Sequence, residues 1–166
     1  MTLTPRLAFG AAIVLVSVAM AAALYLQHGL GFAPCPLCVL QRMGFVAAAV
    51  FAAGALFAGR AQRLRLVFGV LAILGAIAGG GVAVWHSFLV AYPPESMSCG
   101  RPFEWFHEDF PLGVWLPKLF RGDGDCFQVD WTLLGLNIPQ WAAVMFVVLI
   151  VLLIAGIAAT NKIRTR

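Results

Sequence analysis

Four long runs of apolar residues, separated by polar segments, dominate the pattern of the chain. They predict membrane spans over about residues 7–26, 39–59, 66–90 and 140–160. Roughly 20 apolar residues cross a bilayer as a helix, because backbone polar groups in lipid must pair within their own segment. The second run is uncharged only over Met43–Gly59, so Gln41 and Arg42 are expected at the headgroups.

The predicted fold is therefore an all-α membrane protein, an antiparallel bundle of four transmembrane helices. We expect a single membrane domain over residues 1–166, with outer loops at about 27–38 and 91–139. The composition agrees, since 62% of the residues are hydrophobic and only 11% are charged, which is far more apolar than a soluble domain. A cleavable signal peptide is the alternative for the first run, and an intact N-terminus on the mature protein would exclude it.

The charges predict the orientation of this bundle. Seven of the eleven basic residues lie near the chain ends and in the turn between the second and third spans: Arg6, Arg60, Arg63, Arg65, Lys162, Arg164 and Arg166. All seven acidic residues lie between the third and fourth spans. Since cytoplasmic loops are enriched in Lys and Arg, both termini are expected in the cytoplasm. The basic residues behind the net charge of +4 flank the membrane spans and do not form one patch. The lipid bilayer is therefore the expected partner, and nucleic acid is not.

Aromatic and small residues add two predictions about the spans. The five tryptophans fall towards the outer side and predict an aromatic belt at the membrane interface: Trp85, Trp105, Trp115, Trp131 and Trp141. Gly75 and Gly79 lie four residues apart in the third span, which predicts close contact with a neighbouring helix.

The four cysteines all fall in the predicted outer loops or at their edge, at positions 35, 38, 99 and 126. This distribution is typical of an oxidising compartment. Four cysteines allow three pairings, but Cys35 and Cys38 are close enough in sequence to form a local pair. Cys99 would then pair with Cys126.

The segment around Cys35 and Cys38 has the chemistry of a redox site. Pro36 suits the first position of a helix, because its missing N–H would be unpaired there anyway. Cys38 then lies in the first turn, where the helix dipole favours a thiolate, and Arg42 shares its face one turn later. A stabilised thiolate is both a nucleophile and a good leaving group.

Other roles for these cysteines are less well supported. A structural disulfide across so short a segment closes too small a loop to stabilise much. Haem attachment needs a histidine directly after the second cysteine, where Val39 stands. A zinc site needs four ligands. Cys35 and Cys38 with two of His28, His86 and His107 could supply them, but the chain has no second closely spaced pair of ligands. We expect no metal.

The residues beside the loop cysteines give weaker guidance. Adjacent glycines predict flexible flanks that let a disulfide change partners. Arg101 favours a thiolate at Cys99, whereas Asp123 and Asp125 disfavour one at Cys126. By this leaving-group argument alone, a partner thiol would attack Cys126.

These features together match a known family. They are the Cys35-Pro36-Leu37-Cys38 motif with Gln41-Arg42, His86 at the outer end of the third span, Cys99, Gly124-Asp125-Cys126, and the run WTLLGLNIPQW from Trp131 to Trp141. In this order and topology, the chain resembles the DsbB family of bacterial disulfide bond formation proteins over essentially its whole length.

The resemblance implies a quinone-dependent oxidoreductase of the bacterial inner membrane, with its cysteines in the periplasm. A periplasmic DsbA-like thiol oxidase attacks the Cys99–Cys126 disulfide at Cys99, and the electrons pass through Cys126 to the redox-active pair Cys35–Cys38. Cys38 meets ubiquinone or menaquinone, and Arg42 and His86 are implied in binding it. Attack at Cys99 opposes the charge-based preference, but partner docking decides which sulfur is reached. A disulfide that has oxidised a partner must be reoxidised, and the chain shows no flavin, haem or iron–sulfur motif, so the residues alone also favour a lipid-soluble oxidant.

Two alternatives remain from the sequence. A vitamin K epoxide reductase-like enzyme also joins four helices to quinone and thiol chemistry, but its usual active pair lies near the last span. A four-span scaffold protein with two structural disulfides would need no acceptor, and its bridges would stay oxidised with or without quinone.

Overall fold

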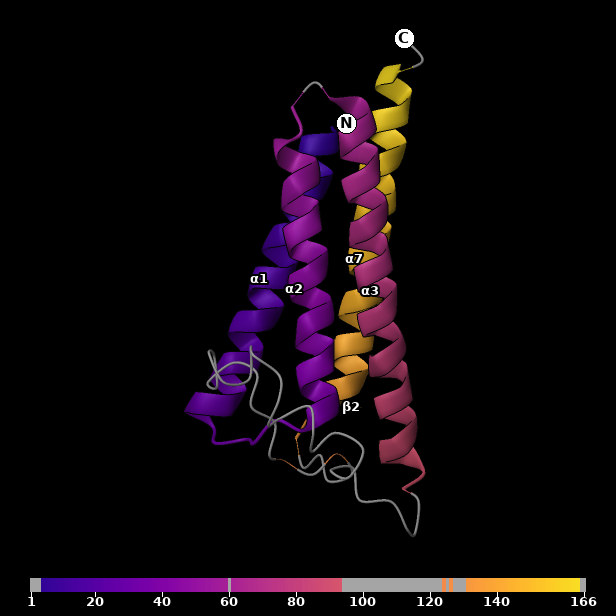
Figure 1. Ribbon diagram of the computed structural model, residues 1–166. Coiled ribbons are helices and arrows are strands. Elements are labelled where there is room, and N and C mark those ends of the chain that lie inside the picture. The colour runs from indigo at the N-terminus through magenta and orange to yellow at the C-terminus, as the bar shows by residue number, and fades with distance from the viewer. Residues whose placement is uncertain (1–3, 60, 94–123, 125, 127–130, 165–166) are drawn as a thin grey trace, which may run out of the picture.

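The computed structural model describes residues 4–59, 61–93, 124, 126 and 131–164. Four long helices run antiparallel: α1 (Pro5–Gly29), α2 (Pro36–Phe57), α3 (Gln62–Ala91) and α7 (Ile138–Arg164). A short hairpin of β1 (Thr132–Leu133) and β2 (Leu136–Asn137) precedes α7. α1 begins and α7 ends at one end of the bundle, whereas α2 begins at the other, close to the hairpin (Figure 1). All four helices are long and apolar enough to cross a membrane, which confirms the predicted fold class.

The helices pack as a ring in which each packs chiefly on two neighbours, and α2 and α7 also touch across the centre. α2 and α3 form the most extensive pair, α3 packs on α7, and α1 closes the ring against α7 and α2. Fully buried aromatic and aliphatic side chains from α1 and α7, among them Phe9, Phe146, Leu149 and Leu153, fill the centre. Because the ring surrounds an apolar core, each polar group buried near it requires a partner within the bundle.

Glycines allow α2 and α3 to approach closely, as the sequence predicted for Gly75 and Gly79. A Cβ atom placed on Gly44 would lie 2.6 Å from the Cα of Gly79, and one on Gly79 would overlap the ring of Phe146. Phe146 stacks on Phe45 with 3.8 Å between ring centroids. The α2–α3 contact therefore depends on the absence of side chains at Gly44 and Gly79.

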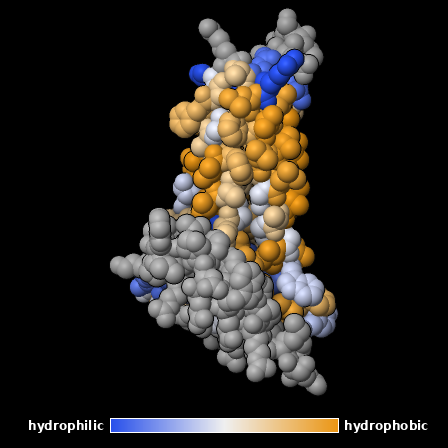
Figure 2. Space-filling model, in the orientation of Figure 1, coloured by the Kyte–Doolittle hydropathy of each residue, from blue (hydrophilic) through white to orange (hydrophobic). Residues whose placement is uncertain are grey.

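Apolar side chains cover the face of the bundle that Figure 2 shows, while hydrophilic residues gather at the end where α7 terminates. Trp85, Phe88 and Tyr92 are exposed along the C-terminal end of α3, and their rings follow one another at 6.0 and 5.1 Å. Exposed aromatic residues at a helix end are typical of a membrane interface. Trp105 and Trp115 lie outside the described residues.

The start of α7 is defined by capping and by the hairpin. Asn137 Oδ1 accepts from the backbone N–H of Gln140, and Gln140 Oε1 accepts from that of Asn137, so the two satisfy each other reciprocally. Leu134 and Gly135 both have positive φ, as a tight two-residue hairpin turn requires. Trp141 Nε1 donates to the carbonyl of Leu133 and ties the hairpin to α7.

The glycine contact leads to a stability prediction. Gly79→Ala should lower the free energy of unfolding by about 1–3 kcal/mol, because its methyl group must displace Phe146 or separate α2 from α3. Gly81→Ala, on the same helix, is the matched control, since a Cβ there has no atom within 4 Å. Denaturant unfolding in detergent measures both, and equal stability of the two variants would contradict the described packing.

Candidate functional site

Cys35 and Cys38 are positioned by the beginning of α2. Cys35 is the N-cap residue with extended backbone angles, and its sulfur accepts the backbone N–H of Cys38 at 3.3 Å. Pro36 occupies the first helical position, and Cys38 lies in the first turn, as the sequence predicted. The cap geometry turns both sulfurs toward each other, because Cys35 takes the role that Ser or Asp commonly plays at an N-cap.

The two sulfurs form a closely coupled pair of free thiols. Cys35 Sγ donates to Cys38 Sγ at 3.1 Å. This hydrogen bond, together with burial, raises the pKa of the Cys35 thiol above its ordinary value. Cys35 therefore retains its proton, and the sulfur of Cys38 is the acceptor at the helix N-terminus. Such an arrangement favours a thiolate at Cys38.

Arg42 lies one turn beyond Cys38 and is buried, with 6% of its surface exposed. Its guanidinium donates to Gln27 Oε1 at 2.7 Å and to the carbonyl of Ala23 at 3.4 Å, both on α1. The charge also interacts electrostatically with both sulfurs. A buried cation next to the sulfur pair is thus held by the neighbouring helix.

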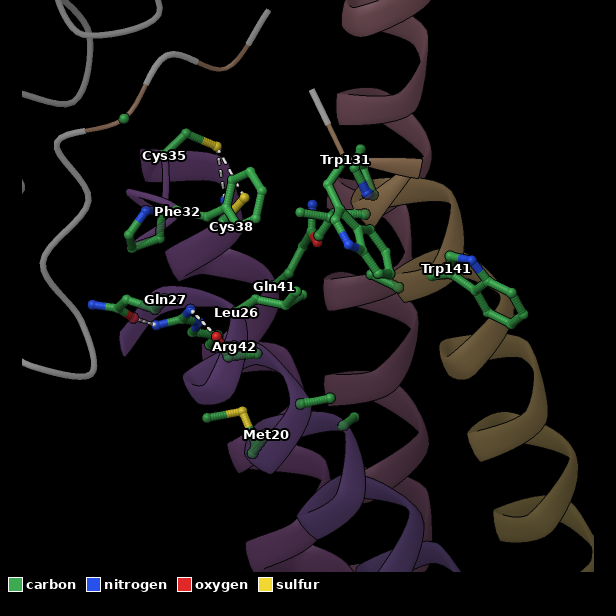
Figure 3. A pocket seen from close by; sticks show the side chains of 18 of the residues that line it. Met20, Leu26, Gln27, Phe32, Cys35, Cys38, Gln41, Arg42, Trp131 and Trp141 are labelled. Carbon is green, nitrogen blue, oxygen red and sulfur yellow. Dashed lines mark hydrogen bonds between the residues drawn. The ribbon is translucent and has the colours of Figure 1, made fainter. Parts of the chain in front are cut away.

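A cavity of about 540 Å³ opens beside this pair, between the C-terminal end of α1 and the beginnings of α2 and α7. Cys38, Gln41 and Arg42 contribute its polar groups, and Figure 3 shows Arg42 linked to Gln27 within it. Apolar side chains supply most of the remaining wall, including Met20, Leu26, Phe32, Phe45, Trp131, Trp141 and Met145. Its composition is that of a small-molecule site: apolar walls with a few convergent polar groups.

His86 on α3 is completely buried and connects the sulfur pair to the second loop. Its Nε2 atom lies 3.7 Å from Cys35 Sγ and 3.1 Å from the carbonyl oxygen of Cys126. Its Nδ1 atom lies 3.0 Å from Nε2 of Gln41. His86 also lines the cavity, so it borders both the sulfur pair and the space beside it.

Cys126 is buried against the start of α2 and is disulfide-bonded. The backbone N–H of Gly124 donates to the carbonyl of Pro34 at 2.9 Å. A Cβ atom on Gly124 would collide with the carbonyl of Ala33. Gly124 is therefore needed for close approach, whereas the sequence suggested only flexibility. The sulfurs of Cys35 and Cys126 and one ring nitrogen of His86 lie within 4.8 Å of one another.

The structure brings together five of the six site residues named from the sequence: Cys35, Cys38, Arg42, His86 and Cys126. Cys99 lies outside the described residues. Sequence reasoning missed Gln27 and the cavity walls, and it assigned Trp131 and Trp141 to an interfacial belt, although both line the cavity. Gln27 had a usable signal, because it is a polar residue at the outer end of the first span, level with Arg42.

The group of Cys35, His86 and Cys126 has a spacing compatible with metal ligands. Metal binding by cysteine requires a thiolate, and the sulfur of Cys126 is in a disulfide. Only two ligands then remain in the group, fewer than zinc requires. Its donor set fits thiol exchange better than metal binding.

Comparison with known proteins agrees with this chemistry. Residues 5–156 match the family described as "Disulfide bond formation protein DsbB". Three relatives carry the name "Disulfide bond formation protein B". The one from Aromatoleum aromaticum is 43% identical over 81% of both chains, and that from Paracidovorax citrulli is 43% identical over 87% of this chain and 83% of its own. The relative from Verminephrobacter eiseniae is 44% identical over 93% of this chain and 87% of its own.

The match runs through all four helices and includes both the capping cysteine pair and Cys126. A four-helix membrane protein with this sulfur site and this extent of similarity belongs to the DsbB family of disulfide bond formation proteins.

Proposed function

We propose that the protein reoxidises a periplasmic DsbA-like thiol oxidase by disulfide exchange and passes the electrons to a membrane quinone. The observation that carries this proposal is the junction at the start of α2. There Cys126 lies within 4.8 Å of Cys35, and Cys35 is hydrogen-bonded to Cys38 beside an apolar cavity with a buried arginine. The sulfurs and the cavity form a continuous route for two electrons.

The sulfur chemistry follows from these positions. The reduced partner attacks Cys99 of the Cys99–Cys126 disulfide, which forms a mixed disulfide and releases Cys126 as a thiolate. Cys126 then attacks Cys35 of the oxidised Cys35–Cys38 pair, so that the Cys35–Cys38 bond breaks and Cys38 leaves as a thiolate. The N–H groups of the first helical turn and the charge of Arg42 stabilise this leaving group. The second thiol of the partner attacks the mixed disulfide and releases Cys99, and Cys99 then attacks Cys126, which re-forms the Cys99–Cys126 bond and frees Cys35.

The cavity fits a quinone headgroup, which is flat, apolar and bears two carbonyl oxygens. A bound ubiquinone or menaquinone would accept the two electrons of the Cys35–Cys38 dithiol as that disulfide re-forms. The apolar walls bury the ring, and the guanidinium of Arg42 supplies charged N–H donors for a carbonyl oxygen. Cys38 and His86 border the same space, so both lie within reach of a ligand there.

The distribution of charge supports an inner-membrane location with both termini in the cytoplasm. α1 begins and α7 ends at one end of the bundle, and Cys35 lies at the other (Figure 1). With the basic end inward, the sulfurs face the periplasm, where the DsbA-like partner is expected. A scaffold role is not favoured, because Cys35 and Cys38 border a cavity with a buried arginine and the relatives are named for disulfide bond formation.

Replacing the sulfur that meets the quinone should stop turnover. Cys38→Ser should abolish steady-state oxidation of a reduced thioredoxin-like partner, because no Cys35–Cys38 disulfide can form. Quinone absorbance during turnover measures this loss. Normal turnover by the variant would remove Cys38 from the mechanism.

Replacing the sulfur that meets the partner should have a different effect. Cys99→Ser should prevent the mixed disulfide with the partner, because the attacked sulfur is missing. Non-reducing electrophoresis after acid quenching detects this complex. A mixed disulfide that still forms at the wild-type level would remove Cys99 from the mechanism, because Cys126 without its bridge is a thiol and cannot bond a reduced partner by exchange.

Arg42 should act mainly on the quinone. Arg42→Ala should raise the apparent quinone KM by about tenfold or more, since a charged hydrogen bond to the ligand is lost. Arg63→Ala is the matched control, because Arg63 is exposed at the opposite end of the bundle. Initial rates at varied quinone concentration separate KM from kcat. Equal KM values for the two variants would refute the role of Arg42.

A further inference from the structure

Two buried polar side chains contact each other next to the sulfurs, and one of them, Gln41, has no role in the proposed electron route. Gln41 on α2 is 4% exposed and His86 on α3 is 0% exposed. Gln41 Nε2 and His86 Nδ1 are 3.0 Å apart. A buried amide in an apolar bundle is costly unless its hydrogen bonds are made, so this contact suggests a specific function for Gln41.

The hydrogen bonds of His86 select one form of its ring. An amide nitrogen only donates, so Nδ1 of His86 must accept from Gln41. In a neutral imidazole the proton is then on Nε2. Nε2 lies 3.1 Å from the carbonyl oxygen of Cys126, which only accepts. Both contacts are therefore satisfied by the same tautomer, with Nε2–H donating to Cys126.

The opposite tautomer would break both contacts. Nδ1–H would face the amide N–H of Gln41, and the lone pair of Nε2 would face the carbonyl oxygen of Cys126. Cys126 would then lose its hydrogen bond to His86. The orientation of Cys126 toward Cys35 thus depends on the proton position in His86.

We propose that Gln41 is a positioning residue, which fixes His86 in the Nε2–H tautomer so that His86 holds Cys126 beside Cys35 for disulfide exchange. The inference rests on the proposed function and adds a residue to it. Gln41 acts through His86 and exchanges no electrons itself. Its effect is on the encounter of the two sulfurs.

The exchange can be isolated from the quinone in a Cys38→Ser chain. The thiolate of Cys35 attacks Cys126, the Cys35–Cys126 bond forms, and the Cys99–Cys126 bond breaks. Cys99 leaves as a thiolate and takes up a proton, so that no external oxidant is needed. Alkylation of the free thiols followed by peptide mass mapping gives the equilibrium ratio of the two bridges.

In this background Gln41→Leu should lower the ratio of the Cys35–Cys126 bridge to the Cys99–Cys126 bridge by about fivefold, which corresponds to one lost hydrogen bond. Ser87→Ala is the control on α3, since the Ser87 hydroxyl bonds only the carbonyl of Ala83 in its own helix; its ratio should not change. An unchanged ratio in Gln41→Leu would overturn the positioning role alone. Absence of the Cys35–Cys126 bridge in the Cys38→Ser parent would instead contradict the proposed electron route.

A second variant gives a readout that a merely structural role would not move. An ionised Gln41→Glu side chain only accepts, so it draws the proton of His86 to Nδ1. The bridge ratio should therefore fall below that of the parent, although the carboxylate has nearly the same size and shape as the amide that it replaces. A ratio equal to that of the parent would contradict the proposal.

Nitrogen NMR tests the tautomer directly in the full-length protein. The chain has three histidines, and His86→Asn assigns the signal of His86 by its loss. We expect the Nε2–H form in the unsubstituted protein and a loss of this preference in Gln41→Leu. An Nδ1–H form in the unsubstituted protein would overturn the inference.

Discussion

The hydrogen bond between the cap of α2 and its first turn is the interaction on which the site depends. Cys35 Sγ accepts the backbone N–H of Cys38, and this contact fixes where the helix begins and where both sulfurs lie. Because the helix starts there, Arg42 falls one turn beyond Cys38 and reaches α1. Cys35 therefore caps the helix and is also one of the two sulfurs of the redox pair, so that one hydrogen bond determines both the start of α2 and the position of the sulfurs.

The apolar bundle makes each buried polar contact near this cap consequential. Gln27 holds Arg42, Gln41 contacts His86, and His86 contacts the carbonyl of Cys126. Few polar partners exist at this depth, and an unpaired polar group would be costly. These contacts link α1, α2, α3 and Cys126 around the cavity, which explains how a small protein holds the Cys35–Cys38 pair, Cys126 and the cavity in register.

Much of this arrangement was predictable from local pattern. Apolar runs predicted four helices, Pro36 predicted the start of α2, and the spacing of Gly75 and Gly79 predicted close packing. The rest depends on contacts between residues distant in sequence. Gln27 stands out as a polar residue at the end of a span, but its partner Arg42 lies on another helix and is identified only by the fold. Trp131 and Trp141 resemble any interfacial tryptophan until the fold turns them to the cavity. The hairpin was missed because Leu134 is an unusual residue for a turn with positive φ.

The most direct test of the account is the coupling of the two redox reactions in one mixture. Purified protein, a reduced thioredoxin-like partner and a quinone are combined, and quinone absorbance is followed against the thiols remaining on the partner. The account predicts that one quinone is reduced for each disulfide formed in the partner. Oxidation of the partner with no change in the quinone, or permanently inert sulfurs at the start of α2, would contradict it.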